Sequence, residues 1–192
     1  MKRPSSRHGR ARDVLANKPA PGAATLAAAS EAVAAVVSGG RAADEVLLDT
    51  AERIDRSAIQ AIALGTLRWY LQLLPAVGAL LDRPIAGLPP NLAALLVTGA
   101  HQVEYSRAPP QTSVHLAVEA SRLVGAARAS GLVNAVLRRF VAERAELLAV
   151  ASTPDMATPD DESSARSSAH PLWLVRQLRA AWPEHYLAIL AA

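Results

Sequence analysis

Arginines beside apolar helical stretches are the residues of this 192-residue chain that are best suited to binding a ligand. Apolar side chains recur along residues 131–140 at the i, i+3, i+4, i+7 spacing of one helix face: Val133, Val136, Leu137 and Phe140. Arg138 and Arg139 stand at the border of that face. Guanidinium groups in such a position can donate to phosphate oxygens while a core holds their helix in place. Both arginines are therefore candidates for contact with a polyanion such as RNA.

Two polar patterns in the sequence have structural interpretations that we favour over functional ones. Asn134 lies one helical turn before Arg138, close to buried positions, and we interpret it as a structural clasp that bonds to the backbone rather than to a ligand. His115, Glu119 and Arg122 are spaced like a catalytic set on one helix face. Ion pairs on helix surfaces have the same spacing and are commoner, so we expect an ion pair.

The patterns expected of an enzyme or a metal protein are missing from the sequence. The chain has no cysteine, which excludes disulfides, cysteine zinc sites and cysteine nucleophiles. Its five histidines lack metal-ligand spacing, no phosphate-binding glycine loop is present, and no serine stands in a glycine-flanked elbow. We expect no bound metal and no cofactor in this chain. The residues themselves favour a binding module, although they show no aromatic surface for stacking bases.

Positive charge is concentrated near the N-terminus. Residues 1–22 contain prolines, glycines and no apolar period, so we expect a disordered arm. Its basic residues that could contact RNA are Lys2, Arg3, Arg7, Arg10 and Arg12. Because the net charge of the whole chain is only +3, the arm carries much of the imbalance that would favour a polyanion, although such arms are often merely solvated.

The elements that position these residues are predicted to be helices throughout. Hydrophobic residues make up 51% of the chain and aromatic residues only 4%, and much of the apolar content is alanine, which favours helix. Helices are predicted over 23–37, about 42–48, from a cap at Asp55 or Ser57 to a kink or end at Pro75, over 92–103, from a cap at Thr112 or Ser113, and over 131–148. Gly99 predicts a close helix crossing.

The composition changes after residue 150. Residues 151–169 are rich in Ser, Thr, Asp and Pro and predict a flexible linker, and residues 170–192 predict a short helical tail. The tail has more apolar surface than it can bury alone, which predicts a docking strip for a partner made of Trp173, Leu174, Leu178 and Trp182. The sequence has neither a signal peptide nor an apolar run of about 18 residues, so we expect a cytoplasmic protein.

Three segments resemble, in order and spacing, the N-terminal domain of the RsmB family, also called Sun or Fmu, of bacterial small-subunit rRNA cytosine-C5 methyltransferases. They are residues 64–68 (LGTLR), 99–110 (GAHQVEYSRAPP) and 131–140. The resemblance covers about residues 23–148. It implies that residues 23–150 form a NusB-like, all-α bundle of two packed helical subdomains that binds RNA. Arg68, Arg138 and Asn134 match the family, so Arg68 joins the candidates for RNA contact. Arg107, which lies within the second segment, is a further candidate. The start of the tail resembles the entry to the methyltransferase region of RsmB.

Departures from the family pattern also carry information. The first helix begins with Ala23 and Ala24 where the family has arginine, so an RNA contact there would have to come from the upstream arm. Family members use a cysteine thiolate and S-adenosylmethionine held on a Rossmann-like sheet, and this sequence has neither the cysteine nor such a sheet pattern. We therefore expect the front part of an RsmB-like protein, with the catalytic domain and S-adenosylmethionine belonging to a full-length relative.

Three functions follow from these expectations. The first is an RNA-binding domain that positions small-subunit rRNA for a methyltransferase domain in cis or in trans. The second is a free-standing NusB-like antitermination factor that binds RNA and the ribosomal protein NusE. The third is a helical protein-interaction module without an RNA function, because a NusB-like fold alone is compatible with either kind of partner.

Overall fold

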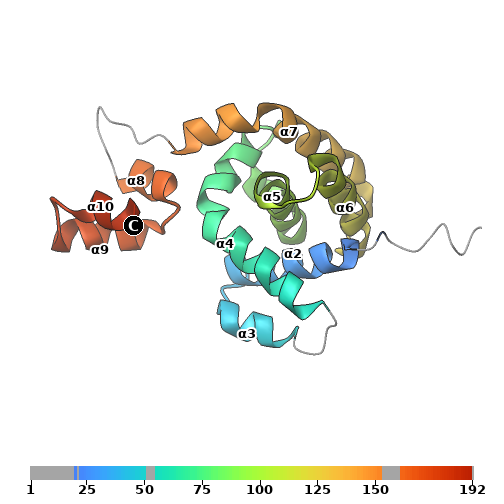
Figure 1. Cartoon of the computed structure of the whole chain (residues 1–192), viewed down its shortest axis with the longest axis horizontal. Coiled ribbons are helices and arrows are strands. Elements are labelled where there is room, and N and C mark those ends of the chain that lie inside the picture. Colours follow the sequence, from blue (N-terminus) through green and yellow to red (C-terminus); the bar gives the residue numbers. More distant parts are fainter. Residues whose placement is uncertain (1–19, 21, 51–54, 153–160, 192) are drawn as a thin grey trace, which may run out of the picture.

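The computed structural model describes residues 20, 22–50, 55–152 and 161–191, and within them the regular elements are helices. One helix, α5 (Pro90–Tyr105), runs through the middle of a bundle and is surrounded by four other helices of the described chain (Figure 1). These are α2 (Ala23–Val37), α4 (Arg56–Gly78), α6 (Pro110–Leu123) and α7 (Ser130–Ser152). Shorter elements are α3 (Ala43–Leu48) and the 3-10 turns Ile85–Gly87 and Ala127–Ala129. The predicted all-α fold is confirmed.

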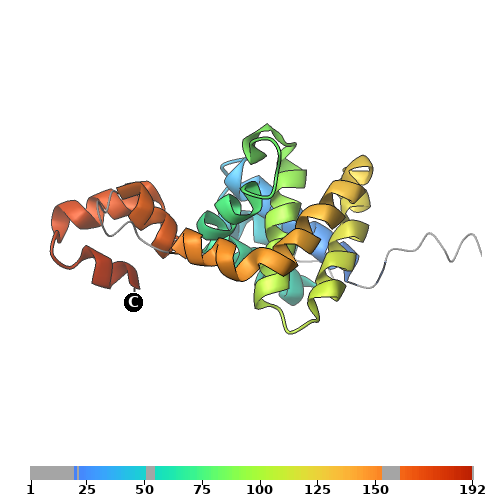
Figure 2. The same cartoon turned by 90° about the horizontal axis from the view of Figure 1, so that it is seen from above.

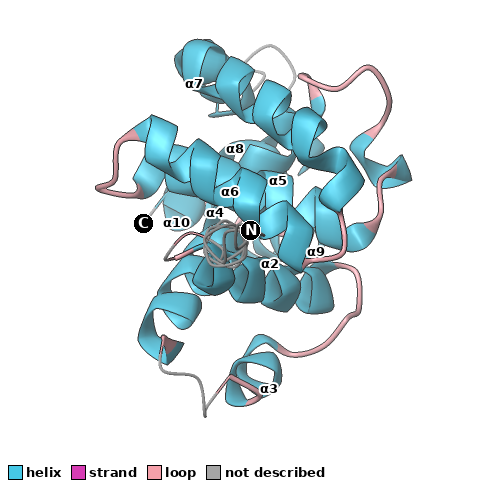
Figure 3. Ribbon diagram, turned by 90° about the vertical axis from the view of Figure 1, so that its right-hand side faces the viewer, coloured by secondary structure: helices cyan, strands magenta, loops and turns pink. Residues whose placement is uncertain are grey.

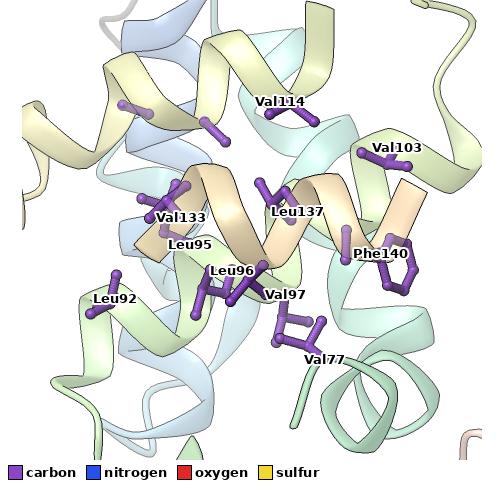
Figure 4. Close-up of a cluster of buried hydrophobic side chains, with 14 of the residues drawn as sticks. Val77, Leu92, Leu95, Leu96, Val97, Val103, Val114, Val133, Leu137 and Phe140 are labelled. Carbon is purple, nitrogen blue, oxygen red and sulfur yellow. The ribbon is translucent and has the colours of Figure 1, made fainter. Parts of the chain in front are cut away.

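The main core forms where α7 crosses α4 and α5. Val133, Leu137 and Phe140 of α7 have no exposed surface and point toward apolar side chains of the other two helices, including Val77 and Leu96 (Figure 4). The predicted buried face of residues 131–140 is thus confirmed. Burying large apolar side chains in this way is the principal source of stability for such a bundle.

A second, smaller core lies between α2, α3 and the first half of α4. Small side chains such as Ala29 and Ala63 let the helices approach closely, and Val33, Val46 and Ile59 fill the remaining space. The start of α4 is also held by a polar contact, because Thr25 Oγ1 of α2 donates a hydrogen bond of 2.6 Å to the Asp55 carboxylate. Asp55 thus stands at the predicted cap position, but its side chain bonds to Thr25 instead of capping α4.

Of the two outcomes predicted at Pro75, a kink or an end of the helix, the end is excluded, and one predicted helix start was wrong. Helix α4 continues through Pro75 to Gly78, because Leu73, Ala76 and Val77 around the proline are buried and their packing outweighs one lost backbone hydrogen bond. Helix α6 begins at Pro110 rather than after Thr112, since proline suits a first helical turn whose N–H groups lack partners anyway. Ser113, considered as a cap, instead donates to the carbonyl of Gln102 (3.2 Å).

The region predicted as a linker contains a helix. Helix α8 (Asp161–Ser168) lies within 151–169, α7 continues into that range as far as Ser152, and residues 153–160 lie outside the described part. Helix α8 forms because it has something to pack on: it contacts α4 and α7, and Gln72 Nε2 of α4 donates to the Ser167 carbonyl at 2.6 Å. Local polarity suggested a linker, but these long-range contacts outweigh it.

The tail helices α9 (Leu172–Ala181) and α10 (Tyr186–Ala191) join α8 in a small unit at the end of α7 (Figure 2). Its core consists of Ala165, Val175, Tyr186 and Leu190, with Leu172 and Leu178 packed against it. The predicted docking strip is therefore divided. Leu178 packs inside the unit and Leu174 is half-buried, whereas Trp173 and Trp182 are 61% and 53% exposed.

Candidate nucleic-acid interface

Arg138 is presented at the junction of two helices that pack side by side, α6 and α7 (Figure 3). Its Nε donates to Asn134 Oδ1 at 3.0 Å, one turn earlier on α7. The expected bond from Asn134 to the backbone is thus replaced by one to a side chain, because the i, i+4 spacing brings the two side chains together. Arg138 and Asn134 line a pocket of about 250 Å³ together with Gln111 and His115 of α6. This pocket combines an exposed cation with amide and imidazole groups that can hydrogen-bond.

Arg139 points to another part of the molecule. Its guanidinium group forms an ion pair with Glu143 (3.3 Å) and donates to the Leu80 carbonyl (3.3 Å) just beyond α4. The adjacent carboxylate offsets its charge, and the second bond ties α7 to the end of α4. Two neighbouring arginines that look equivalent in the sequence therefore have different surroundings.

Arg68 lies in an aromatic cluster that sequence reasoning missed. Its Cζ is 5.0 Å from the centroid of the Trp69 ring, a cation–π distance. Trp69 of α4 in turn stacks on Tyr105 of α5, with ring centroids 5.4 Å apart and an interplanar angle of 14°. The two aromatic residues are 36 positions apart, so only the crossing of α4 and α5 brings them together. For this reason the sequence alone did not reveal an aromatic surface.

His101 completes the cluster from one turn earlier on α5. Its ring centroid is 5.2 Å from that of Tyr105, and Gln102 Nε2 donates to its Nδ1 at 3.1 Å. A Cβ added to Gly65 of α4 would come within 2.7 Å of His101 Nε2, so the glycine is what lets the imidazole pack there. Burial lowers the pKa of His101 to about 4 from 6.5, because a charged ring would lose its hydration.

This burial predicts a loss of stability in mild acid. Between pH 6.5 and about 4 the unfolded chain protonates His101 while the folded chain does not, so the unfolded state binds more protons and stability falls as the pH is lowered through that window. We expect this loss in the free energy of unfolding to reach about 1–2 kcal/mol at pH 5, as measured by urea unfolding. His101→Gln should flatten this part of the pH dependence, and the exposed His115→Gln should leave it in place. Equal slopes in the wild type and His101→Gln would contradict the assignment.

The remaining candidates occupy separate positions. Arg107 is exposed in the turn between α5 and α6. Arg122 pairs with Glu119 on α6, which confirms the ion-pair interpretation of that face. The basic arm, including Lys2, Arg3, Arg7, Arg10 and Arg12, lies outside the described residues. Within the described ranges, no cluster of His, Cys, Asp or Glu could hold a metal ion. In the same part of the chain, no helix is both long and apolar enough to cross a membrane.

The arrangement of α2 to α7 is matched by a known family over residues 26–142, the NusB family. The chain belongs to the NusB family. This membership agrees with the three sequence segments and with the all-helical bundle around α5. The family match ends within α7, so α8 to α10 lie beyond it.

Curated relatives match a longer stretch of this NusB-family chain than the family match covers. It is 37% identical over 169 residues to the ribosomal RNA small subunit methyltransferase B of Pseudomonas putida, covering 86% of this chain and 36% of that protein. It is 35% identical over 143 residues to a probable ribosomal RNA small subunit methyltransferase B of Coxiella burnetii, covering 74% and 31%. The Shigella sonnei protein of the same name is 31% identical over 167 residues, covering 85% and 37%. The chain thus spans about a third of the length of these relatives, and the expected likeness to a NusB-like part of such proteins is confirmed.

Proposed function

We propose that this chain is the RNA-binding domain of an rRNA (cytosine-C5) methyltransferase of the same type as these relatives, acting in the cytoplasm on small-subunit rRNA. One observation carries the proposal: this NusB-family chain aligns with proteins named as rRNA small subunit methyltransferase B, over 86% of its length in the Pseudomonas putida protein. On this view the domain holds rRNA in position for a methyltransferase domain in cis or in trans.

The chemistry of methyl transfer does not fit the residues of this chain. S-adenosylmethionine in such enzymes is held on a parallel sheet, whereas the described residues form helices, and the sequence has no cysteine to act as a nucleophile. We therefore assign no catalytic step to this chain. The cofactor and the thiolate would belong to the methyltransferase domain, and the role of this chain would be to bind and orient the RNA.

Apolar surface is available for such a methyltransferase domain. A groove of about 890 Å³ is lined by Leu67, Leu71 and Leu74 of α4 and by residues at the start of α9. On the tail, Trp173 and Trp182 add exposed aromatic surface. Apolar surface of this kind commonly marks a protein interface, and here it supports a domain docked beside α4 and the tail.

An RNA titration tests the proposed function. The chain should bind a small-subunit rRNA hairpin more tightly than an unrelated RNA of equal length, and its affinity should fall as the salt concentration rises, because bound arginines release counterions from phosphates. Equal affinity for both RNAs at all salt concentrations would contradict a targeting role. Failure to bind either RNA would contradict the proposal that this chain binds RNA.

Arg138 should matter more than its neighbour in this titration. We expect Arg138→Gln to weaken hairpin binding about fivefold to tenfold, because its guanidinium is exposed and bonded only to the neutral Asn134 in the described structure. Arg139→Gln is the matched control on the same helix. It should change the affinity less than about twofold, since Glu143 already offsets that charge. Equal losses in the two variants would contradict the assignment of Arg138, and circular dichroism checks that both variants fold.

The alternative function is a NusB-like antitermination factor that binds RNA and the ribosomal protein NusE. Membership of the NusB family is the observation that favours it. The names of the relatives favour the methyltransferase role instead, as do alignments that are longer than the NusB-family match. Capture of purified NusE by this chain in a pull-down assay would support the alternative. RNA binding without NusE capture would support the leading proposal.

A further inference from the structure

A cleft between the bundle and the tail unit has the features of a binding site. We name it the α4/α8 cleft. It has a volume of about 370 Å³ and is lined by Arg68, Trp69, Ser164, Ser167, Leu187 and Leu190, among others. Helix α8 lies next to α4 in Figure 1, and the hydrogen bond from Gln72 to the Ser167 carbonyl holds α8 against α4. The cleft therefore has one wall from the NusB-like bundle and one from the tail.

The bundle wall carries an aromatic ring and a cation that are already ordered. Trp69 lines the cleft while it stacks on Tyr105, so its indole is held in place before any ligand arrives. Arg68 lies over the same indole, is exposed, and is the charged side chain among the described residues that line the cleft. Aromatic rings beside arginines bind unpaired bases by stacking and their phosphates by charge.

The tail wall carries a hydroxyl that has no partner. Ser164 is 1% exposed, and its Oγ is a buried polar atom without a hydrogen bond in the described structure. A buried hydroxyl in this state costs free energy that a ligand group could recover. The hydroxyls of Ser167 and Ser168 both donate to the Ser164 carbonyl, at 3.3 and 2.7 Å, and each keeps lone pairs that can accept from a ligand.

We propose that the α4/α8 cleft binds one unpaired nucleotide of single-stranded RNA. On binding, Arg68 moves off the indole to meet the phosphate, which leaves the ring face that Tyr105 does not cover free for the base. Entry of the base between α4 and α8 opens the buried Ser164 hydroxyl to a polar edge of the base. A volume of about 370 Å³ is at the lower end of the range for small-molecule sites, which suits one nucleotide and excludes a double helix. This inference rests on the proposed RNA-binding function, and it adds a site separate from Arg138 together with a preference for unpaired RNA.

Tryptophan fluorescence gives a direct test with the whole chain. The exposed Trp173 and Trp182 are replaced by phenylalanine, which leaves Trp69 as the one indole. Titration with single-stranded penta-uridylate and penta-adenylate should quench its emission, because stacked bases quench indole fluorescence. A duplex RNA of the same length should leave the emission unchanged, since paired bases cannot enter the cleft. As a control, a second protein keeps Trp173 and carries Trp69→Phe and Trp182→Phe, and its emission should not respond.

Substitutions in the cleft separate binding from folding. Ser164→Ala should weaken binding of the single strand about threefold to tenfold while the midpoint of urea unfolding stays the same or rises, because the hydroxyl has no partner to lose in the free protein. If Ser164 were purely structural, the substitution would instead lower the midpoint of urea unfolding and leave the binding of the single strand unchanged. Arg68→Gln should make the slope of log affinity against log salt concentration for single-strand binding shallower by about one, which corresponds to the loss of one phosphate contact.

The outcomes distinguish the two proposals. Binding of the rRNA hairpin without quenching of Trp69, or with equal quenching by single-stranded and duplex RNA, overturns the cleft and leaves the proposed function standing. An unchanged single-strand affinity in Ser164→Ala also overturns the cleft. Absence of all RNA binding overturns both proposals. Quenching by single strands only, with weaker binding by Ser164→Ala, supports the cleft.

Discussion

Replacement of Phe140 by alanine is expected to lower the free energy of unfolding by about 3–5 kcal/mol. Phe140 is the one phenylalanine of the chain and has no exposed surface, and it packs where α7 meets α4 and α5 (Figure 4). The loss combines the transfer of a large apolar side chain with the cavity left behind, because neighbouring side chains in a close-packed core relax only in part. Urea unfolding followed by circular dichroism at 222 nm, where the helical signal is strong, measures the change.

A matched control lies on the same helix. Val150 of α7 is 73% exposed, so Val150→Ala should change the free energy of unfolding by less than about 0.5 kcal/mol. Similar losses in the two variants would mean that the end of α7 is buried or that Phe140 is not a core residue. Because Phe140 lies two residues beyond Arg138, the RNA affinity of Phe140→Ala should be compared only under conditions in which the variant remains folded.

Gly99→Val is expected to cost about 2–3 kcal/mol, by overpacking. A Cβ at Gly99 would approach Leu137 Cδ1 to 2.7 Å and the Ala117 Cβ to 3.4 Å, so α5, α6 and α7 meet at a point that has room only for hydrogen. Leu137 has no exposed surface and cannot swing into solvent to relieve the clash. The gain in helix propensity on replacing glycine recovers only a part of the loss. Urea unfolding measures the difference in the free energy of unfolding between the wild type and Gly99→Val.

Two comparisons make the Gly99 prediction specific. Gly131→Ala is the matched control, because a Cβ there meets no atom within 4 Å, and its effect should stay within about 1 kcal/mol. Truncating the clashing side chain should relieve part of the cost, so the loss in Gly99→Val with Leu137→Ala should be smaller than the sum of the two single losses. Additive losses would show that Gly99 and Leu137 do not compete for the same space.

The two candidate RNA sites differ in what they would recognise. The pocket beside Arg138 offers an exposed cation next to amide and imidazole groups, which suits phosphate contact without a requirement for unpaired bases. The α4/α8 cleft offers a stacking surface, which suits single strands. Hairpin and single-strand titrations of the Arg138 and Ser164 variants can therefore be interpreted independently.

Features that depend on neighbours in the sequence were predicted well from the sequence. The alanine-rich composition and the 3.6-residue apolar period indicated an all-helical fold, and the buried face of residues 131–140 was correct because helical spacing alone decides which side chains share a face. Gly99 was recognised as a close crossing for a similar reason, since glycine within an apolar helix usually marks a contact. The order of three short segments also pointed to the family that the comparison then showed.

Features that depend on residues far apart in the chain were decided only by the tertiary structure. The Trp69–Tyr105 stack requires the crossing of α4 and α5. The α4/α8 cleft requires α8 to fold against α4, although the composition of α8 suggests a linker. Arg138 and Arg139 are adjacent in the sequence, yet a helix turns about 100° per residue, so one lies toward α6 and the other reaches the end of α4. The physical reason is the same in each case: local patterns determine which side chains share a helix face, and only packing determines what that face meets.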